Sequence, residues 1–294
     1  MILANHQRVV VGVDGSPNSI SAARWAAAVA DRLSSPLHIA SAVQEPSFYL
    51  AESAHVVPNE VWGRQRHNAT QLLADLSDSI GESYPALSVS TGVHTDSAAV
   101  MLTELSRSSR LIVVGNSGTG LIISTLLGST AKRVADKAAC PVLIWRGDIA
   151  EPDAPIVVGV DGSSTSESAV AHAFELASLF AVPLVAAHTW NSASHGGGVT
   201  LPGFVDWAAV EHEEAAQLAE CLAGWTEKYP DVQVERVLKQ SNAAHTLVEL
   251  SSRAQLVVVG SRGRGAITRT LLGSTSSNLA HHSHCPVLIC RDSQ

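Results

Sequence analysis

The sequence repeats itself, and this duplication constrains the fold more than any other feature. RVVVGVDGS at 8–16 returns as PIVVGVDGS at 155–163, LIVVG at 111–115 as LVVVG at 256–260, and CPVLIW at 140–145 as CPVLIC at 285–290. From AAVMLTELS at 98–106 and AAHTLVELS at 243–251 onwards, the two copies keep a constant register. We therefore interpret the chain as two copies of one unit, with domains at 1–146 and 155–294 joined by the polar linker GDIAEPDA at 147–154.

Within each copy, short apolar runs alternate with segments of helical spacing. The runs predict strands near 8–13, 37–43, 87–93, 111–114 and 141–145, and in the second copy near 155–160, 183–190, 232–238, 256–259 and 286–290. Between the runs of the first copy, helices are expected at 17–34, 59–80, 97–108 and 129–138. Continuous apolar strands suit a parallel sheet covered on both faces. The alternation predicts an α/β fold with two tandem, doubly wound, five-stranded parallel-sheet domains of Rossmann-like type.

The composition excludes several classes of protein. With 46% hydrophobic and 16% charged residues, the chain is globular rather than disordered. A net charge of -8 argues against a broad nucleic-acid surface. No apolar run is long enough to span a membrane, and the N-terminus lacks the features of a secretory signal. Four cysteines do not indicate a disulfide framework, so we expect buried reduced thiols at 140 and 285 and a cytoplasmic protein.

An aspartate closes the first strand of each copy. Asp14 and Asp161 are both followed by Gly-Ser and then by a predicted helix. One interpretation is a turn or helix cap made by the Asp-Gly-Ser sequence. The other is a carboxylate that accepts hydrogen bonds from sugar hydroxyls or helps to hold a phosphate-bound metal. The second interpretation gains weight because ligands of such sheets bind beyond the carboxyl ends of the strands, where the winding direction reverses.

Glycines follow the fourth strand with the same spacing in both copies. They stand at 115, 118 and 128 and again at 260, 263 and 273, with Ser129 and Ser274 directly after the last of each set. Such glycines let the backbone approach a ligand, and the helix that follows offers free N–H groups to an anion. Tight turns and a serine cap would explain each residue singly, but not the repeated spacing. We predict a phosphate site that is neither a Walker A loop nor the dinucleotide fingerprint.

With these residues in place, the sequence resembles a tandem universal stress protein of the ATP-binding branch, whose pattern is Gly-x2-Gly-x9-Gly-Ser/Thr after the fourth strand and an Asp at the end of the first. The resemblance covers essentially the whole chain. It implies the strand order 3-2-1-4-5 and ATP, with or without magnesium, beside both glycine loops. Adenine would lie near Ala42 and Thr189. The implied binding residues of the first copy are Gly12, Asp14, Ala42, Gly115, Asn116, Ser117, Gly118, Thr119, Gly120, Leu121, Gly128, Ser129 and Thr130. Those of the second copy are Gly159, Asp161, Thr189, Gly260, Ser261, Arg262, Gly263, Arg264, Gly265, Ala266, Gly273, Ser274 and Thr275.

The two copies differ in charge at the loop. Arg262 and Arg264 lie in the second glycine loop, whereas the first has Ser117 and Thr119 at these positions. Because charge-assisted hydrogen bonds to phosphate are strong, we expect unequal nucleotide affinity. The resemblance also implies that the fifth strands, PVLIW and PVLIC, are pairing edges, as in a homodimer.

The function that this pattern favours is a nucleotide-dependent regulator of a stress response or of growth arrest. A slow ATPase or phosphotransferase is the alternative, and a structural protein without a ligand is the third. No nucleophile–base pair is evident, so no catalytic residue is assigned. No metal site is assigned either, because HHSHC at 281–285 is interpreted as a helix end. The segment 191–205 is interpreted as a flap near the adenine or as a spacer.

Overall fold

The computed structural model describes residues 7–44, 59–116, 127–146, 153–190, 206–263 and 272–291. The contacts divide the chain into two compact units, with the division between Trp145 and Arg146. We call residues 3–145 the first unit and residues 146–294 the second unit. Most of the predicted linker, 147–152, lies outside the described residues.

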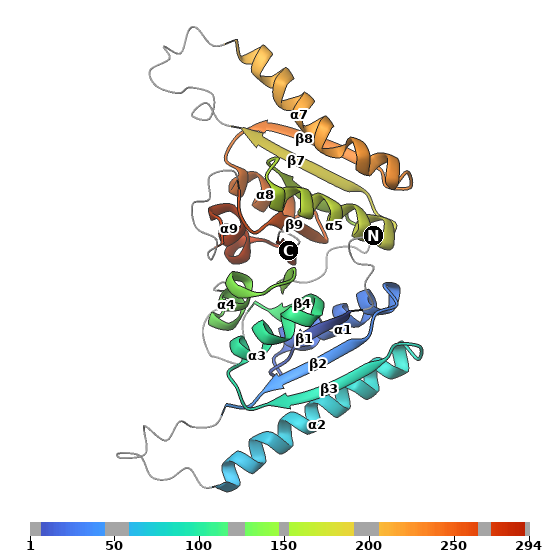
Figure 1. Ribbon diagram of the computed structural model, residues 1–294, viewed down its shortest axis with the longest axis vertical. Coiled ribbons are helices and arrows are strands. Elements are labelled where there is room, and N and C mark those ends of the chain that lie inside the picture. Colours follow the sequence, from blue (N-terminus) through green and yellow to red (C-terminus); the bar gives the residue numbers. More distant parts are fainter. Residues whose placement is uncertain are drawn as a thin grey trace, which may run out of the picture. The chain divides into compact units, whose positions relative to one another are not determined.

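The first unit is a five-stranded parallel sheet flanked by helices (Figure 1). Its strands are β1 (Arg8–Gly12), β2 (Leu37–Ala42), β3 (Val89–His94), β4 (Ser109–Gly115) and β5 (Val142–Trp145). Its helices are α1 (Pro17–Arg32), α2 (Asn59–Ser83), α3 (Ala98–Leu105), the short 3-10 turn η2 (Ser106–Ser108) and α4 (Ser129–Lys137). The strand order is β3-β2-β1-β4-β5, and neighbouring strands pair in parallel.

The second unit repeats this architecture. Its strands are β6 (Ile156–Val160), β7 (Leu184–Trp190), β8 (Val234–Gln240), β9 (Leu256–Gly260) and β10 (Val287–Cys290). Its helices are α5 (Ser164–Phe180), α7 (Trp207–Lys228), α8 (Ala243–Ser251) and α9 (Ser274–His282). The strands run in the order β8-β7-β6-β9-β10, again all parallel. Both units thus confirm the doubly wound fold and the expected order 3-2-1-4-5.

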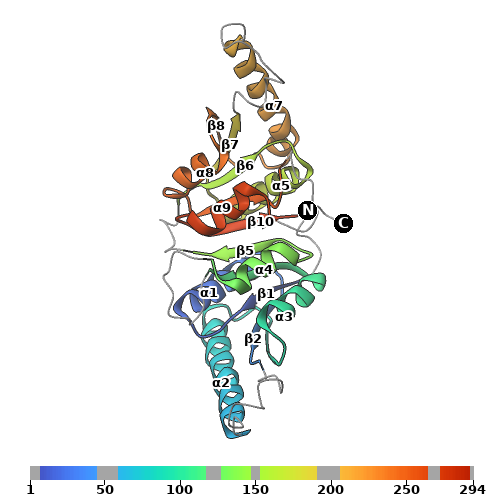
Figure 2. The same ribbon diagram turned by 90° about the vertical axis from the view of Figure 1, so that its left-hand side faces the viewer.

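Each sheet is covered on both faces. In the first unit α1 packs with α2, and α3 packs with α4, on opposite faces of the sheet; in the second unit the corresponding pairs are α5 with α7 and α8 with α9. Figure 2 shows the helices of each unit from the side. Central strands are therefore buried throughout: Val9, Val10 and Val11 of β1 have no exposed surface, which explains the apolar runs of the sequence. None of the described helices combines the length and apolar character needed to cross a membrane.

The winding reverses between the first and fourth strands of each unit. The chain leaves β1 through α1 on one face, and it returns to β4 through α3 on the other face. The loops after β1 and β4 therefore diverge, and a crevice opens beyond the carboxyl ends of the two strands. The same holds for β6 and β9 in the second unit.

Candidate functional site

A cavity lies at this reversal point in each unit. The second unit's cavity has a volume of about 330 Å³ and the first unit's about 310 Å³, at the lower end of the range for small-molecule sites. The first cavity is lined by Gly12, Val13, Asp14, Ser19, Ala40, Ala42, Ala98, Met101, Leu102, Val114, Gly115, Asn116, Gly128, Ser129, Thr130 and Ala131. The second is lined by Gly159, Val160, Asp161, Ser166, Ala187, Thr189, Ala243, Leu247, Val259, Gly260, Arg262, Gly263, Gly273, Ser274, Thr275 and Ser276. Most of these residues correspond pairwise between the two copies.

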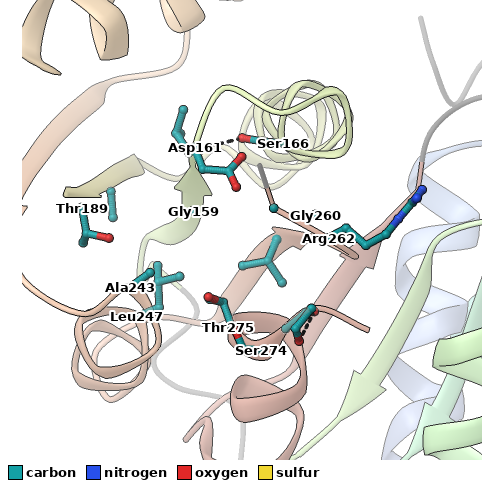
Figure 3. A pocket seen from close by; sticks show the side chains of 16 residues that line it. Gly159, Asp161, Ser166, Thr189, Ala243, Leu247, Gly260, Arg262, Ser274 and Thr275 are labelled. Atoms are coloured by element: carbon teal, nitrogen blue, oxygen red, sulfur yellow. Dashed lines mark hydrogen bonds between the residues drawn. The ribbon is translucent and has the colours of Figure 1, made fainter. Parts of the chain in front are cut away.

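The aspartate after the first strand both makes a turn and faces the cavity. Asp161 Oδ1 accepts hydrogen bonds from the backbone N–H of Ser163 at 3.0 Å and from its hydroxyl at 2.6 Å. Gly162, between them, has a φ of 73°, which glycine adopts without strain. The Asp161 N–H bonds to the hydroxyl of Ser166 at 3.1 Å (Figure 3). The turn interpretation is thus correct for one carboxylate oxygen, and it fixes the orientation of the other.

The second oxygen of this carboxylate points to the glycine loop. A Cβ atom built on Gly263 would lie 2.7 Å from Asp161 Oδ2. A Cβ on Gly260 would lie 2.9 Å from the backbone carbon of Thr165, at the start of α5. Glycine at these two positions therefore lets the loop pack against the start of α5 and against the Asp161 carboxylate.

The far end of the loop returns to its beginning. The Gly273 N–H donates to the carbonyl oxygen of Ser261 at 2.8 Å, and the Gly128 N–H donates to that of Asn116 at 2.6 Å. Each closing glycine is the N-cap of the next helix, and no side chain makes a capping hydrogen bond there. Ser129 is therefore the first helical residue and not a cap. The uncapped N–H groups at the starts of α4 and α9 suit an anion in the cavity.

Arg262 contributes its backbone to the cavity. Its carbonyl oxygen accepts a hydrogen bond from the buried Thr165 hydroxyl at 2.7 Å. The guanidinium group extends away from Asp161 and Thr189 in Figure 3, so direct contact of this side chain with a phosphate requires another rotamer. Among the described residues, every binding residue predicted from the sequence lines a cavity, with the exception of Ser261. Ser261 is buried, and its N–H donates a hydrogen bond to the carbonyl oxygen of Cys290 at 2.7 Å.

Several predicted residues, and one predicted segment, lie outside the described residues. These residues are Ser117, Gly118, Thr119, Gly120, Leu121, Arg264, Gly265 and Ala266, and the segment is the flap at 191–205.

Helices α3 and α8 supply one wall of each cavity, which the strand and glycine motifs do not predict. Ala98 and Leu102 line the first cavity, and Ala243 and Leu247 line the second. A Cβ on Gly12 would lie 2.8 Å from Leu102, so this glycine is needed for packing against the wall. The matching stretches AAVMLTELS and AAHTLVELS contained the signal, because they keep Ala and Leu four residues apart in both copies.

A buried ionisable pair adjoins the second cavity. His188 lies on β7 between the lining residues Ala187 and Thr189, and its Nε2 is 2.5 Å from Oε2 of Glu214 on α7. Its Nδ1 lies 2.6 Å from the carbonyl oxygen of Val160, so Nδ1 carries a proton that it donates to this oxygen. Both side chains are at most 5% exposed. The first copy has Ser41 at the position of His188, so this pair belongs to the second unit alone.

The histidines of the HHSHC segment lie where a helix ends. His281 and His282 form the last turn of α9, and Nδ1 of His281 lies 2.8 Å from the Ser277 carbonyl oxygen. Among the described residues, no cluster of three or more histidine, cysteine or acidic side chains could hold a metal ion.

Fold and cavities together define a tandem α/β protein with a cavity at the same place in each half. The universal stress protein family model matches residues 5–146 and 154–291, and the chain belongs to this family. A universal stress protein of Mycobacterium tuberculosis strain H37Rv is 40% identical over 293 residues, which cover 97% of each chain. One of Mycolicibacterium smegmatis is 38% identical over 297 residues, covering 98% of each. The crystal structure of a universal stress protein from Archaeoglobus fulgidus has a similar fold, with a TM-score of 0.69, 17% identity, and coverage of 97% of this chain and 98% of that one.

Proposed function

We propose that each unit binds one adenine nucleotide, ATP, in its cavity, and that occupancy makes the protein a nucleotide-dependent regulator of a stress response or of growth arrest. The observation that carries the proposal is the pair of matching cavities. Each joins a carboxylate, a glycine-lined backbone and an uncapped helix N-terminus at the reversal point of a parallel sheet.

In this proposal, the polyphosphate lies at the start of α9, where the N–H groups of the first helical turn meet its charge. Gly260 and Gly263 line the cavity beside this helix start. Asp161 Oδ2 accepts a hydrogen bond from a ribose hydroxyl or helps to hold a phosphate-bound magnesium ion. The base lies toward Thr189, over the apolar wall of Ala243 and Leu247. Asp14, Ala42, Ala98 and Leu102 have these roles in the first unit.

The test is calorimetric titration of nucleotide-free protein with ATP, together with mass analysis of small molecules released from freshly purified protein. We expect up to two nucleotides per chain. Saturation at one would leave one cavity without a ligand, and the absence of binding to either unit would overturn the proposal.

The proposal extends to assembly and location. The domains are residues 1–146 and 155–294, with 147–154 as their linker, and the protein is a cytoplasmic homodimer in which fifth-strand edges pair between domains. Light scattering that reports a monomer at micromolar concentration would contradict the homodimer.

A further inference from the structure

We propose that the second unit is the tighter nucleotide site because Ser276 fixes the two ends of its glycine loop, and that the first unit, which has Ala131 in this place, binds more weakly. This inference rests on the proposed function and deepens it. It makes the protein a sensor with two thresholds, whose second unit is filled before the first as the nucleotide concentration rises.

Ser276 ties the loop ends together. It is 1% exposed and lies in the first turn of α9. Its hydroxyl oxygen lies 3.1 Å from the carbonyl oxygen of Ser261 and 3.1 Å from that of Gly273. The Ser261 carbonyl oxygen also accepts a hydrogen bond from the Gly273 N–H. A backbone hydrogen bond and a buried hydroxyl therefore both hold the place where the two ends of the loop meet. Ser276 itself lines the cavity.

A second hydroxyl supports the loop from the opposite side. Thr165, on α5 and 2% exposed, donates its hydroxyl hydrogen to the Arg262 carbonyl oxygen at 2.7 Å. Ser276 on α9 and Thr165 on α5 therefore hold consecutive peptide groups at the beginning of the loop, next to Gly263. The backbone that faces the phosphates is fixed to two helices before a ligand arrives.

The first unit lacks the hydroxyl from its last helix. Its backbone bond from Gly128 to Asn116 is present, but Ala131 replaces Ser276 and offers only a methyl group. Asn18, which corresponds to Thr165, donates its amide hydrogen to the Asn116 side-chain oxygen at 2.8 Å. Ala131 therefore cannot make the hydrogen bond to the start of its loop that Ser276 makes in the second unit.

The extra hydrogen bond of Ser276 affects ATP affinity through the conformational entropy that the loop loses when ATP binds. A loop that is already fixed loses less conformational freedom when ATP binds, so more of the contact energy appears as affinity. One hydrogen bond of this kind corresponds to about a three- to tenfold change in the dissociation constant. Ser276 is therefore a positioning residue, because it acts on the ligand through the loop backbone.

The experiment measures ATP and adenosine affinity for each unit separately by calorimetry. The Gly118→Glu variant silences the first unit and Gly263→Glu silences the second, because the added carboxylate repels phosphate. We expect Ser276→Ala to weaken ATP binding in the second unit, and Ala131→Ser to strengthen it in the first, each by about three- to tenfold. Adenosine has no phosphate to meet the loop, so its affinity should stay within about twofold. The matched control is Ser277→Ala, on the same helix but not among the lining residues.

The outcomes separate the two proposals. If both units bind ATP but neither Ser276→Ala nor Ala131→Ser changes the affinity, this inference is wrong and the proposed function stands. Equal losses for ATP and adenosine would also overturn it, because they would indicate a general loss of structure. If neither unit of the unmodified protein binds ATP, the proposed function fails, and this inference fails with it. Ala131→Ser keeps the test valid even if Ser276→Ala does not fold.

Discussion

At the scale of single residues, Asp161 combines two roles that the sequence presents as alternatives. Oδ1 holds the Asp-Gly-Ser turn through Ser163, while Oδ2 faces the glycine at 263. An amide side chain keeps an oxygen for the turn but loses the negative charge and one acceptor. The two roles can therefore be separated by one substitution.

Asp161→Asn should weaken ATP binding to the second unit roughly ten- to hundredfold, because a hydrogen bond to a charged group contributes about 1.5–3 kcal/mol. The melting temperature should change little, since the turn persists. The control is Asp206→Asn at the N-cap of α7, where Oδ1 also accepts two hydrogen bonds, here both from backbone N–H groups at 3.1 Å, but where the residue does not line the cavity. If calorimetry finds the ATP affinity of Asp161→Asn unchanged, the Asp161 carboxylate serves only the turn and does not contact the nucleotide.

At the scale of helices and strands, the His188–Glu214 pair joins α7 to β7 beside the cavity. His188 also donates from Nδ1 to Val160, so the imidazole connects β6, β7 and α7. A buried pair stabilises little when compared with apolar residues, but removal of one partner leaves the other uncompensated. We therefore expect the second unit to depend on both members.

Glu214→Ala should reduce the free energy of unfolding of the second unit by about 3 kcal/mol, because His188 then lacks a partner for Nε2. Glu214→Gln should cost about 1 kcal/mol, since the side-chain amide can still form a hydrogen bond with Nε2 of His188. Urea unfolding of both variants provides the measurement. A Gln variant as unstable as the Ala variant would show that the charge, rather than the hydrogen bond, matters.

Most of the fold could be predicted from the sequence, because strand burial and helix periodicity are local patterns. The predicted strand at 37–43 is observed as Leu37–Ala42, and the one at 286–290 as Val287–Cys290. The aspartates and glycines could be located because they follow strands directly. The roles of Ser276 and Glu214 could not, since they depend on which residues two distant segments bring together. The direction of the Arg262 side chain likewise depends on its packing and not on its position in the loop.

At the scale of the whole molecule, each unit has its own core and contains a buried thiol that reports on it. Cys140 lies in the first unit, and Cys285 and Cys290 lie in the second. Burial raises the pKa of the Cys285 thiol to about 12, against an ordinary value of 9.0, and hydrogen bonds such as that with Ser283 oppose this only partly. A thiol pKa that is higher in the folded state contributes stability that is fully present below pH 9 and is lost as the pH rises toward 12. At pH 8, Cys285 is therefore protonated and buried, and a thiol reagent reaches it only when the second unit opens.

Thiol labelling should consequently show the two nucleotide thresholds within one intact protein. ATP at a hundredfold excess over the dissociation constant stabilises the unit that binds it by about 2.7 kcal/mol, which slows labelling through unfolding about a hundredfold. As ATP is raised at pH 8 in mild denaturant, protection of Cys285 should precede protection of Cys140. Mass spectrometry of the labelled peptides assigns each rate to its cysteine. In Ser276→Ala the gap between the two protection curves should narrow, because one of the two hydroxyls that hold the second loop is gone. Protection of Cys140 and Cys285 at the same ATP concentration in the unmodified protein would contradict unequal sites.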